Sequence, residues 1–105
     1  MRGDIFRLTA GDERGHEQGG PRYAVVIQSD DVMALSTWIV APTSTSRAAS
    51  FLRPEIEMGG TLTRVLVEHM RAVDPEVRLG DFAGRLTIEE MGSVDRAVRT
   101  VLGLD

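Results

Sequence analysis

The C-terminal part of the chain carries the pattern that most limits the fold, because it predicts a single amphipathic helix. Thr87 and Glu90 form the Thr-x-x-Glu pattern of a capping box, which starts a helix. Apolar residues then recur at helical spacing at positions 88, 91, 94, 98, 101 and 102, and Gly103 stands where a C-terminal cap glycine belongs. One apolar stripe must be covered by another element, so we expect this helix to pack on a sheet.

The rest of the chain reads as short strands joined by turns. Runs rich in β-branched, aromatic and other apolar residues predict strands over residues 4–9, 22–28, 36–41, 51–57, 64–71 and 81–86. The run from Tyr23 to Ile27 is nearly all apolar and should form a central strand. Pro42 is expected to end the third strand, and Pro54 favours an edge position for the fourth. Short helical turns are expected through Met33 and through Leu79. The predicted fold is mainly β, a small, strongly bent antiparallel sheet or barrel with one C-terminal helix.

On the fifth predicted strand, alternation would place Val65, Val67, His69 and Arg71 on one face of the sheet. A histidine in an apolar strand is more often structural than functional, so the roles of His69 and Arg71 depend on what this face contacts.

Composition bounds the class of protein. The 105 residues, 42% apolar and 27% charged, are those of one ordinary soluble domain spanning residues 1–105. No stretch approaches the roughly 18 apolar residues that cross a bilayer, and the first residues lack the apolar core of a signal peptide. We therefore expect a cytoplasmic protein without a membrane partner.

The residue types exclude several chemistries. The chain has no cysteine and only two histidines, far apart in sequence, so disulfides and thiol catalysis are excluded, and we expect no metal site and no cofactor. The net charge of −4 argues against bulk binding to duplex nucleic acid. The negative charge lies mainly near the C-terminus, which leaves room for a phosphate-binding site in the middle of the chain.

The segment Gly19-Gly20-Pro21-Arg22 predicts a chain reversal that leads an arginine into the apolar strand. A guanidinium at the mouth of a buried strand suits an anionic ligand. The alternative is an arginine whose stem covers the rim of the barrel.

The run Thr43-Ser44-Thr45-Ser46-Arg47 places four hydroxyl side chains and one guanidinium in succession. Such runs are usually solvated turns held by local side-chain hydrogen bonds. The same groups could also bind phosphate oxygens, so both interpretations stay open.

Several stretches, in order, resemble the MazF/PemK family of toxin endoribonucleases from bacterial toxin–antitoxin modules. They are residues 2–7 (Arg-Gly-Asp-Ile-Phe-Arg), residues 14–22, residues 24–30 (Ala-Val-Val-Ile-Gln-Ser-Asp), residues 40–45 (Val-Ala-Pro-Thr-Ser-Thr), residues 65–71 (Val-Leu-Val-Glu-His-Met-Arg) and residues 101–104. The resemblance covers nearly the whole chain and implies a small SH3-like (CcdB/PemK-like) antiparallel β-barrel that forms a homodimer.

The resemblance also implies a function. It predicts metal-independent cleavage of single-stranded RNA at a short sequence, by attack of a ribose 2′-hydroxyl that leaves a 2′,3′-cyclic phosphate. It further implies a cognate antitoxin protein as partner, with DNA contacted only through the antitoxin complex.

Residue by residue, the family's catalytic arginine falls on Arg22, and its catalytic threonine falls on Ser44, next to Thr45. The chain departs from the family where it has Tyr23 in place of proline and His69 in place of glutamine, and the segment before the fifth strand is shortened. We predict catalytic roles for Arg22 with Ser44 or Thr45. The predicted substrate-binding residues are His16, Glu17, Gln18, Gly20, Arg47, Glu68, His69 and Arg71.

Proton transfer is the less defined part of the predicted chemistry. A guanidinium keeps its proton near neutral pH, so we assign Arg22 to electrostatic stabilisation rather than to base catalysis. The titrating candidates are His16, Glu17, Glu68 and His69. The alternative function, from another class, is that of the related gyrase-poisoning toxins, which share the fold and act by binding a protein. A plain SH3-like peptide-binding module is disfavoured, because aromatic residues make up only 5% of the chain.

Overall fold

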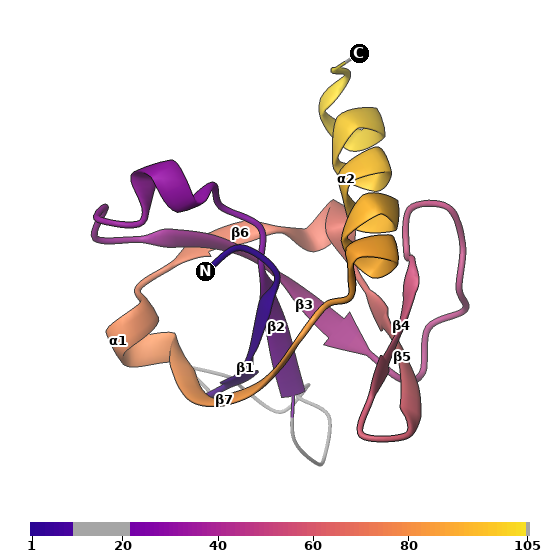
Figure 1. Ribbon diagram of the computed structural model, residues 1–105, viewed down its shortest axis with the longest axis horizontal. Helices are drawn as coiled ribbons and strands as arrows, with labels where there is room; N and C mark the ends of the chain where they lie inside the picture. Colours follow the sequence, from indigo (N-terminus) through magenta and orange to yellow (C-terminus); the bar gives the residue numbers. More distant parts are fainter. Residues whose placement is uncertain (10–21, 105) are drawn as a thin grey trace.

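Figure 1 shows the computed structural model of the chain, which describes residues 1–9 and 22–104. The elements in order are β1 (Asp4–Leu8), β2 (Arg22–Val26), the 3₁₀ turn η1 (Asp30–Val32), β3 (Trp38–Ser44), β4 (Glu55–Met58), β5 (Thr61–Val65), the 3₁₀ turn η2 (Val67–His69), β6 (Arg71–Val73), α1 (Pro75–Arg78), β7 (Leu79–Arg85) and α2 (Ile88–Leu102).

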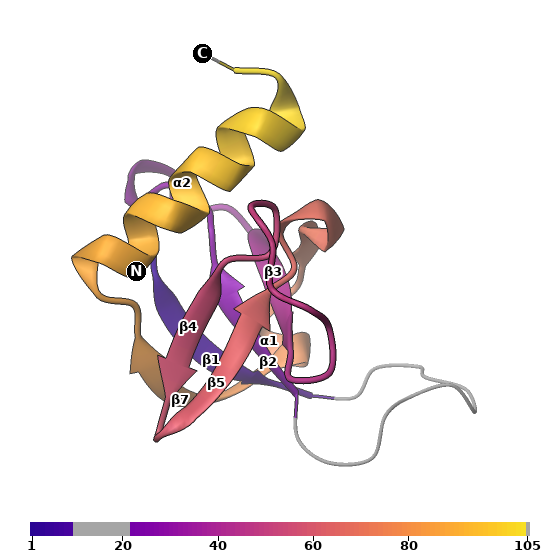
Figure 2. The same ribbon diagram turned by 90° about the vertical axis from the view of Figure 1, so that its right-hand side faces the viewer.

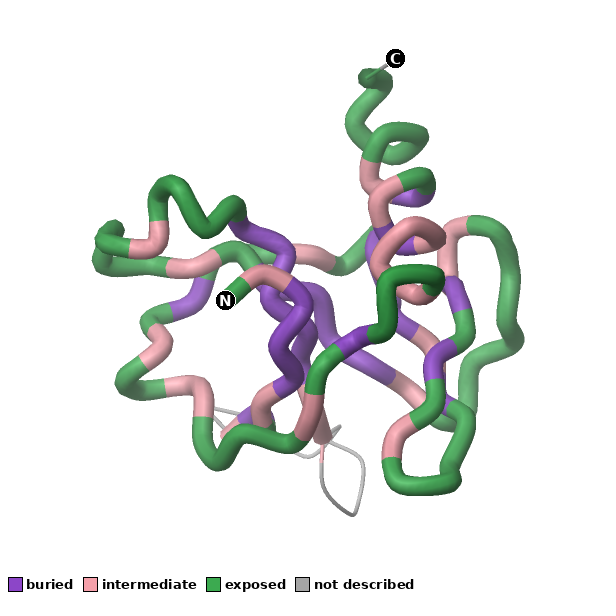
Figure 3. Tube along the Cα trace, in the orientation of Figure 1, coloured by how far each residue is buried: buried purple, intermediate pink, exposed green. Residues whose placement is uncertain are grey.

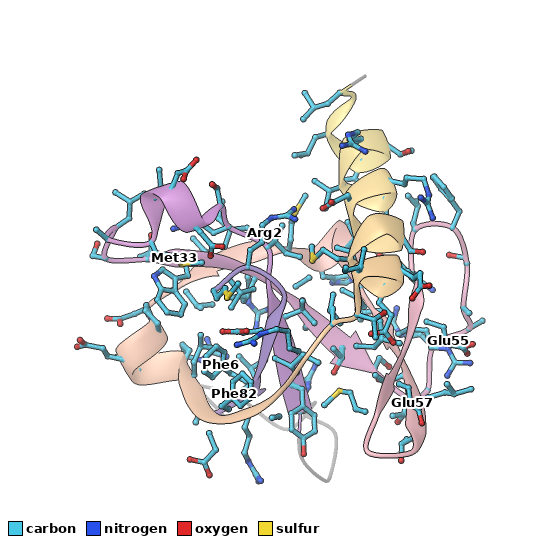
Figure 4. All side chains as sticks on the ribbon, viewed as in Figure 1. Arg2, Phe6, Met33, Glu55, Glu57 and Phe82 are labelled. Carbon is cyan, nitrogen blue, oxygen red and sulfur yellow. The ribbon has the colours of Figure 1, made fainter. Side chains whose placement is uncertain are left out.

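The strands form one antiparallel sheet in the order β4-β5-β3-β2-β1-β7, and β6 also pairs with β3. The sheet curls so that the β4–β5 hairpin stands beside the first turns of α2 (Figures 1 and 2). At the other edge β7 packs on β1, where Phe6 and Phe82 meet edge to face with ring centroids 5.8 Å apart (Figure 4). The prediction of a mainly β fold with a C-terminal helix is confirmed.

Both faces of β2 are buried, which explains its unbroken apolar sequence. Val25 faces a core cluster that also contains Ile5, Ile56 and Val65, and that receives Val94 from α2. Its neighbours Ala24 and Val26 face a second cluster with Leu8, Val40 and Val73. The buried chain therefore concentrates in the centre of the molecule (Figure 3). A strand covered on both faces has no exposed side for polar residues.

Helix α2 begins and ends as its sequence predicts. The Thr87 hydroxyl accepts from the Glu90 amide at 3.0 Å, and Glu90 Oε1 accepts from the Thr87 amide at 2.9 Å. Gly103 caps the far end with φ of +72°. Val94 and Ala97 are fully buried on the sheet, but Ile88 is 92% exposed, so the apolar stripe is covered only along its middle. The last turns extend beyond the strands (Figure 1).

The third strand runs through Pro42 to Ser44, so the prediction that Pro42 ends it is wrong. Along one side β3 pairs with β2, where Ala24 lies opposite Pro42. Along its other side β3 pairs with β6 at residues 38–40 and with β5 at residues 43–44. Pro42 lies in the gap between these two partners, and its carbonyl accepts the Leu66 amide at 2.8 Å. A missing N–H is tolerated there because no ladder bond needs it.

The single strand predicted over residues 64–71 is also wrong. Strand β5 ends at Val65, the turn η2 follows, and β6 begins at Arg71. Val65, Leu66 and Val67 are all buried, which an alternating strand with one solvated face would not allow. The turn moves the chain from one part of β3 to another, and the predicted face shared by Val65, Val67, His69 and Arg71 does not exist.

Other boundaries differ less. The fourth strand begins at Glu55 rather than Phe51, because Ser50 and Arg53 exchange two backbone hydrogen bonds in a tight turn before it. It lies at the sheet edge, as Pro54 predicts. In the part of the chain that the structure describes, no helix is long and apolar enough to cross a membrane.

Candidate active site

A cavity of about 610 Å³ opens where β2 begins and β3 ends. Its lining comes from the start of β2, the end of β3 with the loop that follows, the β4–β5 hairpin and β7. The lining residues are Arg22, Tyr23, Thr43, Ser44, Thr45, Ser46, Arg47, Met58, Gly59, Thr61, Thr63, Leu66 and Ala83. This set of described residues contains two arginines and no carboxylate, which makes the cavity suited to an anion.

The strand register explains why Arg22 and the hydroxyl run meet. In the β2–β3 ladder Ala24 lies opposite Pro42 and Val26 opposite Val40. Continuing this register by two residues places Arg22 opposite Ser44. Directly opposed residues of antiparallel strands have Cβ atoms about 5 Å apart on the same face. Two segments separated in sequence are thus brought together by the central pair of strands.

Hydrogen bonds fix the backbone around these side chains. The Thr43 hydroxyl donates to the carbonyl of Tyr23 at 3.3 Å and ties β3 to β2. Ser44 Oγ accepts from the Ser46 amide at 3.2 Å and lies 3.2 Å from Ser46 Oγ. The local turn expected for this run is therefore present, and it lies inside the cavity rather than on an open surface. Thr45 is exposed in the same loop.

The β4–β5 hairpin forms the opposite wall. Its strands pair from Glu55 with Arg64 to Met58 with Thr61, and Arg64 also lies opposite Ser44 on β3. An ion pair of 2.7 Å joins Arg64 to Glu55, which Figure 4 shows on β4. The hairpin is therefore anchored to the strand that carries Ser44.

Of the predicted substrate-binding residues, Arg47 lines the cavity, whereas Glu68, His69 and Arg71 do not. Glu68 accepts from Arg53 Nε at 2.7 Å, and His69 Nε2 lies 3.7 Å from the same carboxylate oxygen. Burial alone would raise the pKa of Glu68, but the hydrogen bond and charge of Arg53 outweigh it and lower the pKa below its usual value. Arg71 lies on β6, opposite Val40.

The predicted contacts from His16, Glu17, Gln18 and Gly20 lie outside the described residues. Within the described residues, no group of three or more His, Cys, Asp or Glu side chains is placed to hold a metal ion.

The sequence did not single out Tyr23, Met58 and Thr63 as cavity residues. Tyr23 follows Arg22 directly, and strand alternation sends its side chain to the other face of β2. Met58 and Thr63 reach the cavity through the hairpin, whose place against β3 is set by long-range pairing. The departure of Tyr23 from the family pattern was the only local signal.

The comparison with known families matches this fold and this cavity. The profile described as PemK-like, MazF-like toxin of type II toxin–antitoxin system matches residues 1–102. Rv3098A of Mycobacterium tuberculosis, a candidate toxin, is 50% identical over 74 residues, which are 70% of this chain and 69% of that protein. The chain belongs to the family of PemK-like, MazF-like toxins of type II toxin–antitoxin systems, as its sequence motifs predicted.

Solved structures share the fold at low identity. An endoribonuclease from a mycobacterial species, in complex with its cognate antitoxin, superposes with a TM-score of 0.81 at 18% identity and covers 100% of this chain and 96% of that one. MazF of Deinococcus radiodurans gives a TM-score of 0.78 at 21% identity, over 98% and 96% of the two chains. The toxin MazF-mt6 of Mycobacterium tuberculosis gives 0.75 at 15% identity, over 97% and 98%. These likenesses confirm the predicted CcdB/PemK-like fold class.

Proposed function

We propose that this toxin is an endoribonuclease that cleaves single-stranded RNA at a short sequence without a metal ion. The observation that carries the proposal is that Arg22 and the hydroxyl run at 43–46 line one cavity although 21 residues separate Arg22 from Thr43. The fold it shares with solved toxins named as endoribonucleases supports the same reaction.

The cavity offers what the reaction needs at the phosphate. The ribose 2′-hydroxyl attacks its own phosphate, and the five-coordinate transition state carries two negative charges. Arg22 donates two hydrogen bonds to nonbridging oxygens, and a hydroxyl of Ser44 or Thr45 donates a third. Arg47, on the same wall, adds positive charge for the flanking backbone. The bond to the 5′-oxygen then breaks, which leaves a 2′,3′-cyclic phosphate and a 5′-hydroxyl.

Proton transfer in this proposal does not involve η2. Glu68 is bound by Arg53, and neither it nor His69 lines the cavity. The role of His16 or Glu17 as proton carrier stays a prediction from the sequence.

The partners follow from the same chemistry. We propose that a cognate antitoxin covers the cavity with an extended acidic segment, because carboxylates can take the place of RNA phosphates at Arg22 and Arg47. The solved mycobacterial relative in complex with its antitoxin supports such a partner. A homodimer that acts in the cytoplasm, and that meets DNA only through the antitoxin complex, completes the proposal.

The test compares purified wild type, Arg22→Ala and Arg99→Ala on a long single-stranded RNA in the presence of EDTA, with the product ends mapped by sequencing. Arg99 is exposed on α2 outside the cavity, so its variant removes the same charge from a remote site. We expect Arg22→Ala to lose about 100-fold or more in rate, the typical cost of losing one preorganised transition-state donor, and Arg99→Ala to cleave like wild type.

Full activity of a folded Arg22→Ala protein would disprove the assigned role. RNA left uncut by wild type would instead favour the gyrase-inhibitor function, which a supercoiling assay measures directly.

A further inference from the structure

The cavity has two chemically different parts. Arg22, the hydroxyl run and Arg47 form a polar part, and Tyr23, Met58 and Leu66 form an apolar part. Tyr23 and Met58 also pack on the core cluster that contains Val25 and Ile56. A nucleotide has the same division, because its phosphate is charged and its base is a flat, largely apolar ring.

The ring of Tyr23 meets the requirements of a stacking surface. Tyr23 shares a face of β2 with Val25, whereas Arg22 shares the opposite face with Ala24, so the two side chains leave the strand end on different sides. The backbone of Tyr23 is held by the Thr43 hydroxyl, and its side chain is half-buried. Among the described residues that line the cavity, Tyr23 is the aromatic one. A ring already held in place loses little entropy when a base stacks on it.

Thr63 supplies a polar group in the same part of the cavity. The residue is only 3% exposed, yet it lines the cavity from β5. No hydrogen bond joins its hydroxyl to another described residue, whereas buried hydroxyls are nearly always paired in folded proteins. The hydroxyl can donate to or accept from a ligand that fills the apolar part.

We propose that Tyr23 and Thr63 form a binding subsite for one RNA base next to the phosphate bound by Arg22. Tyr23 stacks on the face of the base, and the Thr63 hydroxyl bonds its edge. This inference rests on the proposed function, since it assumes that the cavity binds RNA. It assigns part of the sequence preference to two residues of this chain.

The test measures base and side chain together, without cleavage. Short random single-stranded deoxyoligonucleotides, which lack the attacking hydroxyl, are selected for binding to wild type, and the best sequence is then remade with an abasic site at each position in turn. Wild type, Tyr23→Met, Tyr23→Phe and Thr63→Val are compared, with Phe51→Leu as control because Phe51 is an exposed aromatic outside the cavity. Methionine keeps the apolar packing of position 23 and removes the ring.

We expect one position where the abasic site weakens wild-type binding about tenfold, in line with the usual value of stacking on an aromatic side chain. At that position the abasic site should cost Tyr23→Met nothing, and Tyr23→Phe should behave like wild type. Thr63→Val should lose about fivefold on the intact base and nothing on the abasic one, which corresponds to one hydrogen bond.

Equal abasic losses in wild type and in both Tyr23→Met and Thr63→Val would overturn the subsite. Thr63→Val tests the same position independently if the Tyr23 variants melt too early to assay. The outcomes also separate this inference from the proposed function: cleavage without base coupling removes only the subsite, and base coupling without cleavage removes only the nuclease activity.

Discussion

Glu90 connects the start of α2 to the β4–β5 hairpin, and its removal should destabilise the fold more than removal of the cap hydroxyl. One carboxylate oxygen accepts from the Thr87 amide at 2.9 Å, and the other accepts from the Glu57 amide on β4, also at 2.9 Å. Glu57 lies on the strand that leads into the cavity wall (Figure 4). The capping box thus joins two elements instead of closing only its own helix.

The expected costs follow from these contacts. Thr87→Ala removes one bond to the Glu90 amide and should lower the free energy of unfolding by about 1 kcal/mol. Glu90→Ala removes two charge-assisted bonds, and the freed N–H groups regain water because both bonds lie in an exposed region. We therefore expect a loss of about 2 kcal/mol. The double variant should lose less than the sum, because the two halves of a capping box support each other.

Urea unfolding followed by circular dichroism measures these differences, and Glu89→Ala is the matched control. Glu89 lies in the same first turn and carries the same charge, so its loss costs only the interaction with the helix dipole, about 0.5 kcal/mol. The reasoning is refuted if Glu90→Ala and Glu89→Ala destabilise equally, since the bond to Glu57 would then contribute nothing.

Two further predictions concern Asp4 and the active hydroxyl. Burial alone would raise the pKa of Asp4, but the Arg85 hydrogen bond of 2.6 Å and the nearby N-terminal ammonium lower it below 3.8. A carboxyl with a lowered folded-state pKa adds stability above its unfolded pKa and loses it as pH falls through the folded value, so Asp4→Asn should cost about 1–2 kcal/mol at pH 7 and almost nothing near pH 2; a constant difference in urea titrations across this range would contradict it. Ser44→Ala should lower RNA cleavage about 100-fold while Thr45→Ala loses less than tenfold, because Ser44 lies in register with Arg22; the reverse order in single-turnover assays would assign the role to Thr45.

Features set by nearby residues could be predicted from the sequence. The capping box depends on residues three positions apart, and the cap glycine needs only a local left-handed backbone, so both ends of α2 were correct. The apolar run of β2 indicated a strand buried on both faces, and the two core clusters confirm it.

Features set by distant pairing could not be predicted. Strand β3 has three partners, and its tolerance of Pro42 depends on where β5 ends and β6 begins along one side. The same change of partner breaks the predicted strand at Val65 and inserts η2. No local propensity encodes which partner a strand meets, because propensity describes one segment and pairing joins two.

The site divides in the same way. Arg22 and the hydroxyl run were found because each has a chemical signature in sequence, and the resemblance supplied their pairing. Their meeting in one cavity depends on the β2–β3 register. Tyr23 and Thr63 carry no such signature, since a tyrosine in a strand and a threonine in a hairpin are ordinary residues until the fold places them around one space.

The separation of the two walls has a consequence for recognition. Arg22 and Ser44 stand on β2 and β3, whose preceding residues fill both core clusters, so their geometry is held by the most buried part of the fold. The opposite wall is an edge hairpin that turns at Gly59 and Gly60, where an added Cβ would meet no atom within 4 Å and only the positive φ values of +57° and +88° restrict the residue. Exposed hairpin positions can change at small cost in stability, usually within about 0.5 kcal/mol. We infer that base preference can vary through the hairpin while the phosphate site stays constant, which would let one fold cut different RNA sequences by the same reaction.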